Sequence, residues 1–273
     1  MTIEQSVAGV ARMDLVVDVG NSETVLGLVP REGALEVASH WRLATGVPRT
    51  ADEYELLLRS LLERAGKSGE GLGRAVIGSV VPAQTPVLHS ALSRMVAEDT
   101  WVLSGEKDLP IRLDVDEPQT VGADRIANTL AASMIYGRDT IAVDLGTATT
   151  YDCITADGTF IGGVISQGIQ AGLDWLGSKT AKLPTVELER PERVIGRRTE
   201  TCIRSGVFYS AIDAVDGVVG RIRDEWGRPD VLVVATGGYS EIVGPHCATV
   251  DRVEPFLTLY GLALAGRHLA GEI

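Results

Sequence analysis

The sequence predicts an α/β protein that consists of two similar halves, and three observations support this fold class. Two segments, Leu15–Ser22 and Ile141–Thr147, each run apolar residues into Asp-x-Gly and a small polar residue. Each apolar run predicts a buried strand, and each glycine lets backbone N–H groups approach an anion closely. The aspartates, Asp18 and Asp144, lie about half the chain apart, and strands alternate with helical segments in both halves.

The polar residues of these two segments have the chemistry of a phosphate site. The hydroxyl or amide that follows each glycine can hydrogen-bond a phosphate oxygen, and the aspartate can orient a hydrated magnesium ion. A single strand that ends in Asp-x-Gly is also an ordinary exit into a turn. Two copies, each opening one half of the chain, favour a nucleotide held between two similar halves.

Composition limits the kind of protein that the chain can be. A length of 273 residues fits one large or two mid-sized domains, and 45% hydrophobic residues fit a sizeable core. The net charge of −12, from 37 acidic and 25 basic residues, disfavours nucleic acid and anionic membranes as partners. No apolar run is long enough to span a bilayer, and residues 1–12 are expected to form a loose extension, not a signal peptide. The scattered Cys153, Cys202 and Cys247 support neither a disulfide framework nor a zinc site.

The first half is expected to contain five strands and two helices. A capping box at Thr50 and Glu53 predicts the start of the first helix, whose leucines share one face and which ends near Gly66. The second helix is expected at residues 86–96. The expected strands are residues 14–19, 24–29, 37–43, 75–81 and 101–103.

The second half repeats this order. A helix opens within Val121–Asn128 and ends at Gly137, and Asp157-Gly158 predicts a tight hairpin turn. The expected strands are residues 140–144, 149–155, 160–165 and 230–236. Further helices are expected at residues 169–176, 199–226 and 257–270. The absence of a long linker predicts that the halves pack closely.

Asp124 and Arg125 are adjacent at the predicted start of a helix, directly after Gly122-Ala123. The helix N-terminus adds partial positive charge from unpaired N–H groups. Arg125 can take a substrate carboxylate in bidentate fashion, and Asp124 can accept a proton from an alcohol that attacks a γ-phosphoryl group. The alternative is an aspartate that only caps the helix beside a surface arginine, and spacing alone does not decide between them.

Three weaker motifs have both a structural and a functional interpretation. Ala235–Gly238, after an apolar strand, lets a flat ring or a ribose lie against the backbone, but it is also a generic strand-to-helix turn. Gly162-Gly163 fits a hairpin feature. Thr180–Pro184 is a helix exit into an extended segment, and the Thr180 hydroxyl contacts a ligand only if the fold places it in a cleft.

Five stretches of the chain resemble the type III pantothenate kinases: Asp18–Ser22, Val121–Arg125, Asp144–Thr150, Thr180–Pro184 and Ala235–Gly238. They occur in the same order as in the family, and the resemblance covers about residues 13–265. The resemblance implies the fold shared by acetate and sugar kinases, Hsp70 and actin, in which two ribonuclease-H-like domains enclose ATP. The domains are then expected at residues 13–125 and 126–273, after an N-terminal extension of residues 1–12. The implied reaction is ATP-dependent phosphorylation of pantothenate to 4′-phosphopantothenate, the first step of coenzyme A biosynthesis. A cytoplasmic homodimer with pantothenate near the subunit interface is also implied.

The resemblance also implies roles for individual residues. Asp124 is the proton acceptor, Arg125 holds the substrate carboxylate, and Asp144 binds potassium or ammonium. Asp18 binds magnesium through water. The ATP-binding residues are Asp18, Val19, Gly20, Asn21, Ser22, Glu23, Thr24, Val25 and Thr147. The pantothenate-binding residues are Gly122, Ala123, Asp124, Arg125 and Thr180.

The chain departs from the family pattern at four places. Ser22 replaces the usual threonine and keeps its hydroxyl. Leu113 lies in the neighbourhood where the family often has a tyrosine against pantothenate. Ser166-Gln167-Gly168 and Tyr209-Ser210 replace proline-glycine and tyrosine-glycine.

Two alternative functions stay open at this point: a non-catalytic regulatory relative of the same fold, or a kinase for another small alcohol. The first has no chemical need for a base at Asp124. Within the second, Arg125 beside the base favours an alcohol that carries a carboxylate.

Overall fold

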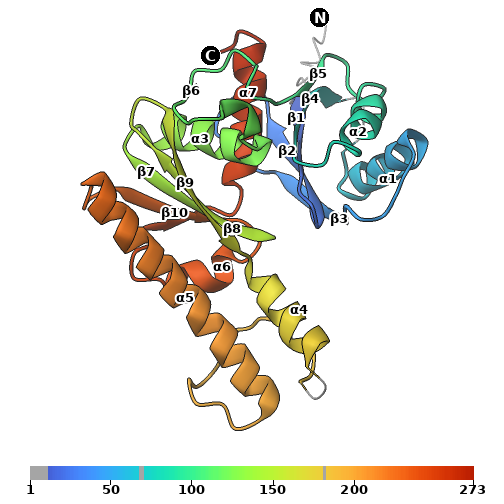
Figure 1. Ribbon diagram of the computed structural model, residues 1–273. Helices are drawn as coiled ribbons and strands as arrows, with labels where there is room; N and C mark the ends of the chain where they lie inside the picture. Colours follow the sequence, from blue (N-terminus) through green and yellow to red (C-terminus); the bar gives the residue numbers. More distant parts are fainter. Residues whose placement is uncertain (1–11, 68–70, 181–182) are drawn as a thin grey trace, which may run out of the picture. The chain divides into compact units, whose positions relative to one another are not determined.

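The computed structural model describes residues 12–67, 71–180 and 183–273, and it contains two mixed β-sheets (Figure 1). The chain divides into two units, each with one sheet. Unit 1 consists of Met1–Ser104 and Leu262–Ile273, and unit 2 consists of Gly105–Gly261. The α/β class predicted from the sequence is therefore confirmed.

Unit 1 contains a five-stranded sheet in the order β3-β2-β1-β4-β5. Strands β1, β2 and β3 are antiparallel neighbours, whereas β4 and β5 continue the sheet in parallel with β1. The strands are β1 (Met13–Val19), β2 (Glu23–Pro30), β3 (Ser39–Ala44), β4 (Leu72–Ser79) and β5 (Thr100–Val102). The helices are α1 (Ala51–Arg64) and α2 (Thr85–Leu92).

Burial of apolar side chains holds α1 and α2 against this sheet. Alternate residues of β1, Leu15, Val17 and Val19, share a core with Tyr54 of α1 and Leu88 of α2. The predicted capping box is confirmed: Thr50 accepts from the Glu53 backbone N–H, and the Glu53 carboxylate accepts from the Thr50 N–H over 2.7 Å.

Unit 2 contains a six-stranded sheet in the order β11-β10-β7-β8-β9-β6. The strands are β6 (Arg112–Leu113), β7 (Thr140–Leu145), β8 (Ala148–Ile154), β9 (Thr159–Gln167), β10 (Leu232–Thr236) and β11 (Arg252–Val253). The α-helices are α3 (Ala123–Tyr136), α4 (Ile169–Lys179), α5 (Thr199–Trp226) and α6 (Ser240–Val243). Two 3₁₀ turns are η2 (Pro118–Thr120) and η3 (Gly244–His246). Helix α7 (Leu257–Leu269) begins in unit 2 and ends in unit 1.

The two sheets share one topology, which confirms the internal similarity predicted from the Asp-x-Gly pair. An antiparallel meander, β1-β2-β3 or β7-β8-β9, is extended on its first strand by two parallel strands, β4-β5 or β10-β11. Strand β6 is an addition at the edge of β9. The aspartates occupy equivalent positions, since Asp18 lies beside Gly78 of β4 and Asp144 beside Thr236 of β10.

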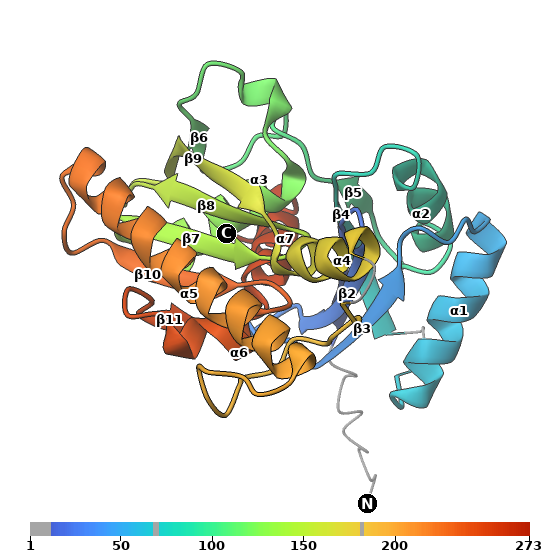
Figure 2. The ribbon, with the colours of Figure 1, turned by 60° about the horizontal axis from the view of Figure 1, so that its bottom comes forward.

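Helices cover both faces of the unit 2 sheet. Ile141, Val143 and Leu145 of β7 point into a core with α4 and α5, whereas Ala142 points into a second core with α3 and the start of α7. Figure 2 shows α5 along one face of this sheet. The positions of α3 and β7 within unit 2 are therefore fixed by burial.

The division of the chain differs from the predicted domains of residues 13–125 and 126–273. The units divide at Ser104/Gly105, because β6 pairs with β9 and α3 packs against β7 and β8. The last residues return to unit 1. Most of the predicted extension, residues 1–11, lies outside the described residues.

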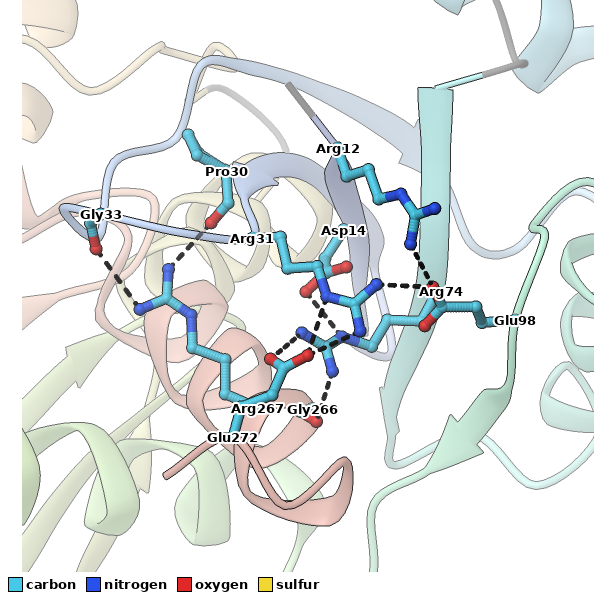
Figure 3. A network of polar contacts seen from close by, with 10 residues as sticks. All are labelled: Arg12, Asp14, Pro30, Arg31, Gly33, Arg74, Glu98, Gly266, Arg267 and Glu272. Carbon is cyan, nitrogen blue, oxygen red and sulfur yellow. Dashed lines mark hydrogen bonds and ion pairs between the residues drawn. The ribbon is translucent and has the colours of Figure 1, made fainter. Parts of the chain in front are cut away.

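The end of the chain is tied to unit 1 by a buried arginine (Figure 3). Arg74 of β4 has 0% side-chain exposure. Its Nε donates to Asp14 over 2.7 Å, Nη1 to the Gly266 carbonyl over 3.1 Å, and Nη2 to Glu272 over 2.5 Å. Arg31 also donates to Glu272, over 2.6 and 2.8 Å. Three of the nitrogens of Arg74 are thus bonded inside the protein.

Candidate active site

The first Asp-x-Gly segment forms a tight turn between β1 and β2. The Gly20 N–H donates to the Glu23 carbonyl over 2.9 Å, and a Cβ on Gly20 would lie only 3.0 Å from that oxygen. Asn21 and Ser22 are exposed on this turn, and Asp18 is half-buried at the end of β1. The turn therefore presents the small polar side chains of Asn21 and Ser22 to solvent, and such side chains can hydrogen-bond a phosphate oxygen.

Two residues of this segment already have protein partners. The Thr24 hydroxyl is buried and hydrogen-bonded to the Thr45 hydroxyl over 2.8 Å. The Glu23 carboxylate pairs with Arg42 over 2.6 Å. Thr24 and Glu23 thus shape the turn, and any contact they make with a phosphate would come from their backbone.

The second Asp-x-Gly segment also forms a tight turn, between β7 and β8, which is one residue shorter than the first. The Gly146 N–H donates to the Ala148 carbonyl over 3.1 Å, and a Cβ on Gly146 would lie 3.3 Å from Oδ1 of Asp144. Thr147 is exposed at the tip of this turn.

Two motifs of unit 2 besides its own lie close to Asp144: Ala235–Gly238 and the start of α3. Gly237, with φ +88°, lies so close that a Cβ would be 2.3 Å from Oδ1 of Asp144. Asn128 of α3 donates to Oδ2 over 3.5 Å, and Asn128 is itself oriented by the Thr258 hydroxyl over 2.9 Å. Burial raises the pKa of Asp144 to about 6, and the charge of Asp124 adds to this rise.

The N-terminal turn of α3 brings Asp124 toward Asp144. Gly122 is the N-cap residue and has no side chain to cap the helix, while Oδ1 of Asp124 accepts the Arg125 backbone N–H over 2.8 Å. Asp124 and Asn128 lie one helical turn apart and share a face of α3. The effect of Asp124 on the pKa of Asp144 shows that both carboxylates belong to one electrostatic cluster.

Arg125 meets a residue that the sequence analysis missed. Its Nε donates to Oδ1 of Asp152 on β8 over 2.6 Å, and its guanidinium lies 4.8 Å from the ring centre of Phe160. Asp152 lies between buried residues in the apolar strand β8. Asp152 could have been identified from the sequence, because it is a charged residue inside a strand predicted to be buried. A buried carboxylate needs a partner.

Thr180 is not brought to this cluster within one chain. Its hydroxyl donates to the Leu176 carbonyl over 2.8 Å and accepts the Leu183 N–H over 3.3 Å, so it closes α4. Helix α4 extends away from α3 in Figure 1. Ala181 and Lys182 of the same motif lie outside the described residues.

The oxygen atoms around Asp144 fit a cation with hard ligands. Among residues 12–67, 71–180 and 183–273, no three His, Cys, Asp or Glu side chains gather as a metal site. However, the buried Thr236 hydroxyl, beside Asp144 in the sheet, has no hydrogen-bond partner in the described structure. A carboxylate with nearby hydroxyl and carbonyl oxygens is the donor set of a monovalent or hydrated ion.

The chain is similar to known proteins over most of its length. A family model for type III pantothenate kinase matches residues 14–221. The type III pantothenate kinase of Moorella thermoacetica is 42% identical over 254 residues, 92% of this chain and 98% of that protein. The type III pantothenate kinase of Streptomyces coelicolor is 41% identical over 259 residues, 92% and 97% of the two chains.

A solved structure supports the fold alone. A protein from Sinorhizobium meliloti, assigned as a 2-dehydro-3-deoxygalactonokinase, has a TM-score of 0.55 at 15% identity, with 94% of this chain and 96% of that chain covered. This likeness confirms the predicted fold class of the sugar kinases and actin. Among the described residues, no helix has the length and hydrophobicity needed to cross a membrane.

Proposed function

The chain belongs to the type III pantothenate kinase family, and from this premise we propose how its residues phosphorylate pantothenate to 4′-phosphopantothenate at the expense of ATP. This reaction is the first step of coenzyme A biosynthesis. The observation that carries the proposal is the cluster at the start of α3. There a carboxylate and a guanidinium, Asp124 and Arg125, lie beside the partly buried Asp144.

Asp124 is the general base in this proposal. The 4′-hydroxyl oxygen of pantothenate attacks the γ-phosphorus of ATP, its proton passes to a carboxylate oxygen of Asp124, and the bond to the bridging oxygen breaks to release ADP. Phosphoryl transfer needs mainly positioning and charge neutralisation, so one base and a magnesium ion suffice. Asp124 lies in the first turn of α3, where the helix dipole attracts negative charge.

Arg125 and the adjacent backbone bind pantothenate. The guanidinium forms a bidentate contact with the substrate carboxylate, a group that a neutral sugar lacks and that in acetate is itself the attacking group. Gly122 and Ala123 allow the substrate to lie close to the helix terminus, because neither has a bulky side chain.

The two turns supply the contacts to ATP. The proposed contacts are Asp18–Val25, with Asp18 holding magnesium through water, and Thr147. Magnesium neutralises phosphate charge when bound. Asp144 holds potassium or ammonium, a role supported by the unpartnered Thr236 hydroxyl and by the excess of carboxylates over cations around it.

The enzyme is proposed to act as a homodimer in the cytoplasm. Thr180 is distant from Arg125 along one chain, so its contact with pantothenate requires a second copy. Ile165 of β9 and Trp175 of α4 are 63% and 60% exposed, which gives unit 2 apolar surface to bury in such a dimer. The described structure contains no disulfide, and free cysteines fit a reducing compartment. A 29 kDa monomer in sedimentation at micromolar concentration would contradict the dimer.

A coupled assay of ADP release tests the proposed function. Pantothenate is compared with acetate and with common sugars, in buffers that contain potassium, ammonium or only sodium. We expect turnover with pantothenate alone, and only when magnesium and potassium or ammonium are present. Turnover with a sugar and none with pantothenate would overturn the substrate, whereas full activity in sodium would overturn only the role of Asp144.

A further inference from the structure

Arg125 is held by a carboxylate that lies outside the motifs of the site. Its Nε donates to Oδ1 of Asp152 over 2.6 Å. The Asp152 side chain has 0% exposure, whereas the Arg125 side chain keeps 16%. A short charge-assisted hydrogen bond to a buried acceptor fixes the guanidinium from its inner side.

Strand β9 forms the other walls around this guanidinium. Phe160 lies against its face, with the ring centre 4.8 Å from the central carbon. Gly163 is the neighbour of Asp152 in the β8–β9 register, and a Cβ there would lie 3.0 Å from Nη2 of Arg125. A glycine at this position therefore leaves room for the terminal amino groups.

The outer side of the guanidinium stays available. Among the described residues, Nη1 and Nη2 of Arg125 donate no hydrogen bond, and its side chain is bonded only through Nε. The two terminal nitrogens, Nη1 and Nη2, which can bind a carboxylate together, are thus open. Asp152 and Phe160 fix the rest of the guanidinium.

The charge of Asp152 is costly to bury, because its side chain has 0% exposure. Burial raises its pKa to about 7, although the adjacent Arg125 acts in the opposite direction. The neighbouring carboxylates of Asp144 and Asp124 raise it further. The protein thus keeps an ionisable group where an apolar one would fold at least as well, which favours a role in the site.

We propose that Asp152 is a positioning residue: it holds Arg125 so that Nη1 and Nη2 meet the carboxylate of pantothenate. This inference rests on the proposed role of Arg125 in substrate binding. Asp152 touches neither substrate nor ATP, and it acts only through Arg125.

Asp152→Leu in the full-length enzyme removes the acceptor, and Asp152→Asn keeps an oxygen at the same place as the matched control. For Asp152→Leu we expect the KM for pantothenate to rise by about tenfold to a hundredfold, the value of a lost hydrogen bond to a charged group. Turnover and the KM for ATP stay within roughly twofold, and Asp152→Asn stays within roughly threefold in all three constants. If Asp152→Leu does not fold, Asp152→Ala makes the same comparison, because it also removes the acceptor.

A double-mutant cycle with Arg125→Leu separates positioning from a purely structural role. In the Arg125→Leu enzyme, Asp152→Leu should change the KM for pantothenate by less than about twofold, since the group it positions is gone. Additive effects on KM would overturn the inference. So would an unchanged KM in folded Asp152→Leu, or a parallel loss of turnover, ATP affinity and melting temperature.

The same experiments also distinguish a failure of this inference from a failure of the two proposals on which it rests, the pantothenate kinase activity and the substrate role of Arg125. If wild-type enzyme does not phosphorylate pantothenate, the proposed function fails and the positioning role falls with it. If Arg125→Leu alone leaves the KM unchanged, the substrate role of Arg125 fails. If Arg125→Leu raises the KM and Asp152→Leu does not, only the positioning role is overturned.

Discussion

Two arginine–aspartate pairs of this protein have similar hydrogen bonds but different surroundings. Arg74 donates Nε to Asp14 over 2.7 Å, and Arg125 donates Nε to Asp152 over 2.6 Å. Arg74 is fully buried and also donates to Gly266 and Glu272 (Figure 3). Arg125 keeps 16% exposure and, among the described residues, bonds through Nε alone.

Under the proposed role of Arg125, the same kind of ion pair serves the fold in one unit and a ligand in the other. A guanidinium whose nitrogens are bonded internally cannot bind a substrate, and its loss leaves carboxylates without a partner. A guanidinium that is fixed on one side and open on the other is prepared for a carboxylate. The number of bonded nitrogens, and not the presence of the ion pair, separates the two roles.

Arg74→Met gives the largest expected effect, because it leaves the buried Asp14 without its hydrogen-bonded cation and leaves Glu272 with Arg31 alone. Loss of one partner from a buried pair costs about 3–5 kcal/mol in the free energy of unfolding. Turnover of the remaining folded enzyme should be normal. Urea unfolding and steady-state kinetics check both statements. Arg59→Met, at the exposed Arg59–Glu55 pair of α1, is the control and should cost roughly 0.5 kcal/mol or less.

Asp124→Asn should have the opposite effect to Arg74→Met, because it should lower turnover and leave the stability unchanged. We expect turnover to fall by roughly 10²–10⁴-fold, as for removal of a positioned general base, with stability and ATP binding retained. Asp124→Ala should behave in the same way. If Asp124 only supported the helix, asparagine would be nearly silent and alanine would cost about 1 kcal/mol of stability with activity kept.

The same substitution at both arginines tests the comparison directly. Arg125→Lys removes the planar fork, so the KM for pantothenate should rise by roughly tenfold while turnover and the melting temperature change little. Arg74→Lys should lower the melting temperature and leave the KM unchanged, because a lysine cannot reach all three acceptors. Equal effects of the two variants on the KM would remove the distinction between the regions.

The smallest expected effect is a pH dependence of stability with opposite sign at two carboxylates, Glu272 beside Arg74 and Asp152 beside Arg125. Hydrogen bonding to Arg74 lowers the pKa of Glu272 below its usual 4.5, so this carboxylate stabilises the fold above that pH and the effect is lost on acidification. The pKa of Asp152 is raised from 3.8 to about 7, so its burial costs stability that grows as the pH rises between those values.

Urea unfolding of two variants between pH 4 and pH 8 measures this difference. Glu272→Gln should be less stable than wild type at pH 8, by roughly 1 kcal/mol, and the difference should begin to shrink only as the pH falls below 4.5. Asp152→Asn should equal wild type near pH 4 and gain relative stability as the pH rises. Parallel pH profiles for the two variants would contradict the assigned directions of the pKa shifts.

Local signals in the sequence predicted the elements that local interactions form. The capping box at Thr50 and Glu53 fixes the start of α1, and the predicted long helix at residues 199–226 is α5 (Thr199–Trp226). The predicted helix at residues 86–96 ends early, at Leu92. The reason is tertiary, since the N–H groups of Ala97 and Glu98 donate to carbonyls at the start of β4.

Elements that depend on a distant partner were missed. Strands β6 and β11 have two residues each and exist only because they pair with β9 and β10. The same reason explains why the units of the structure divide at Ser104/Gly105, whereas the predicted domains divide after residue 125. Residues 105–125 precede the second Asp-x-Gly segment in sequence, yet their strand and the helix that follows pack on its sheet.

The sequence by itself determined the two Asp-x-Gly turns, the start of α3 at Asp124 and Arg125, and the shared topology of the halves, because each depends on neighbouring residues or on a repeated pattern. Only the tertiary structure decided which arginine is fully bonded and which stays open. Asp14 and Glu272 reach Arg74 from opposite ends of the chain, and Asp152 reaches Arg125 from another strand. The acceptors around a guanidinium come from elements that the fold brings together, so no local pattern encodes them.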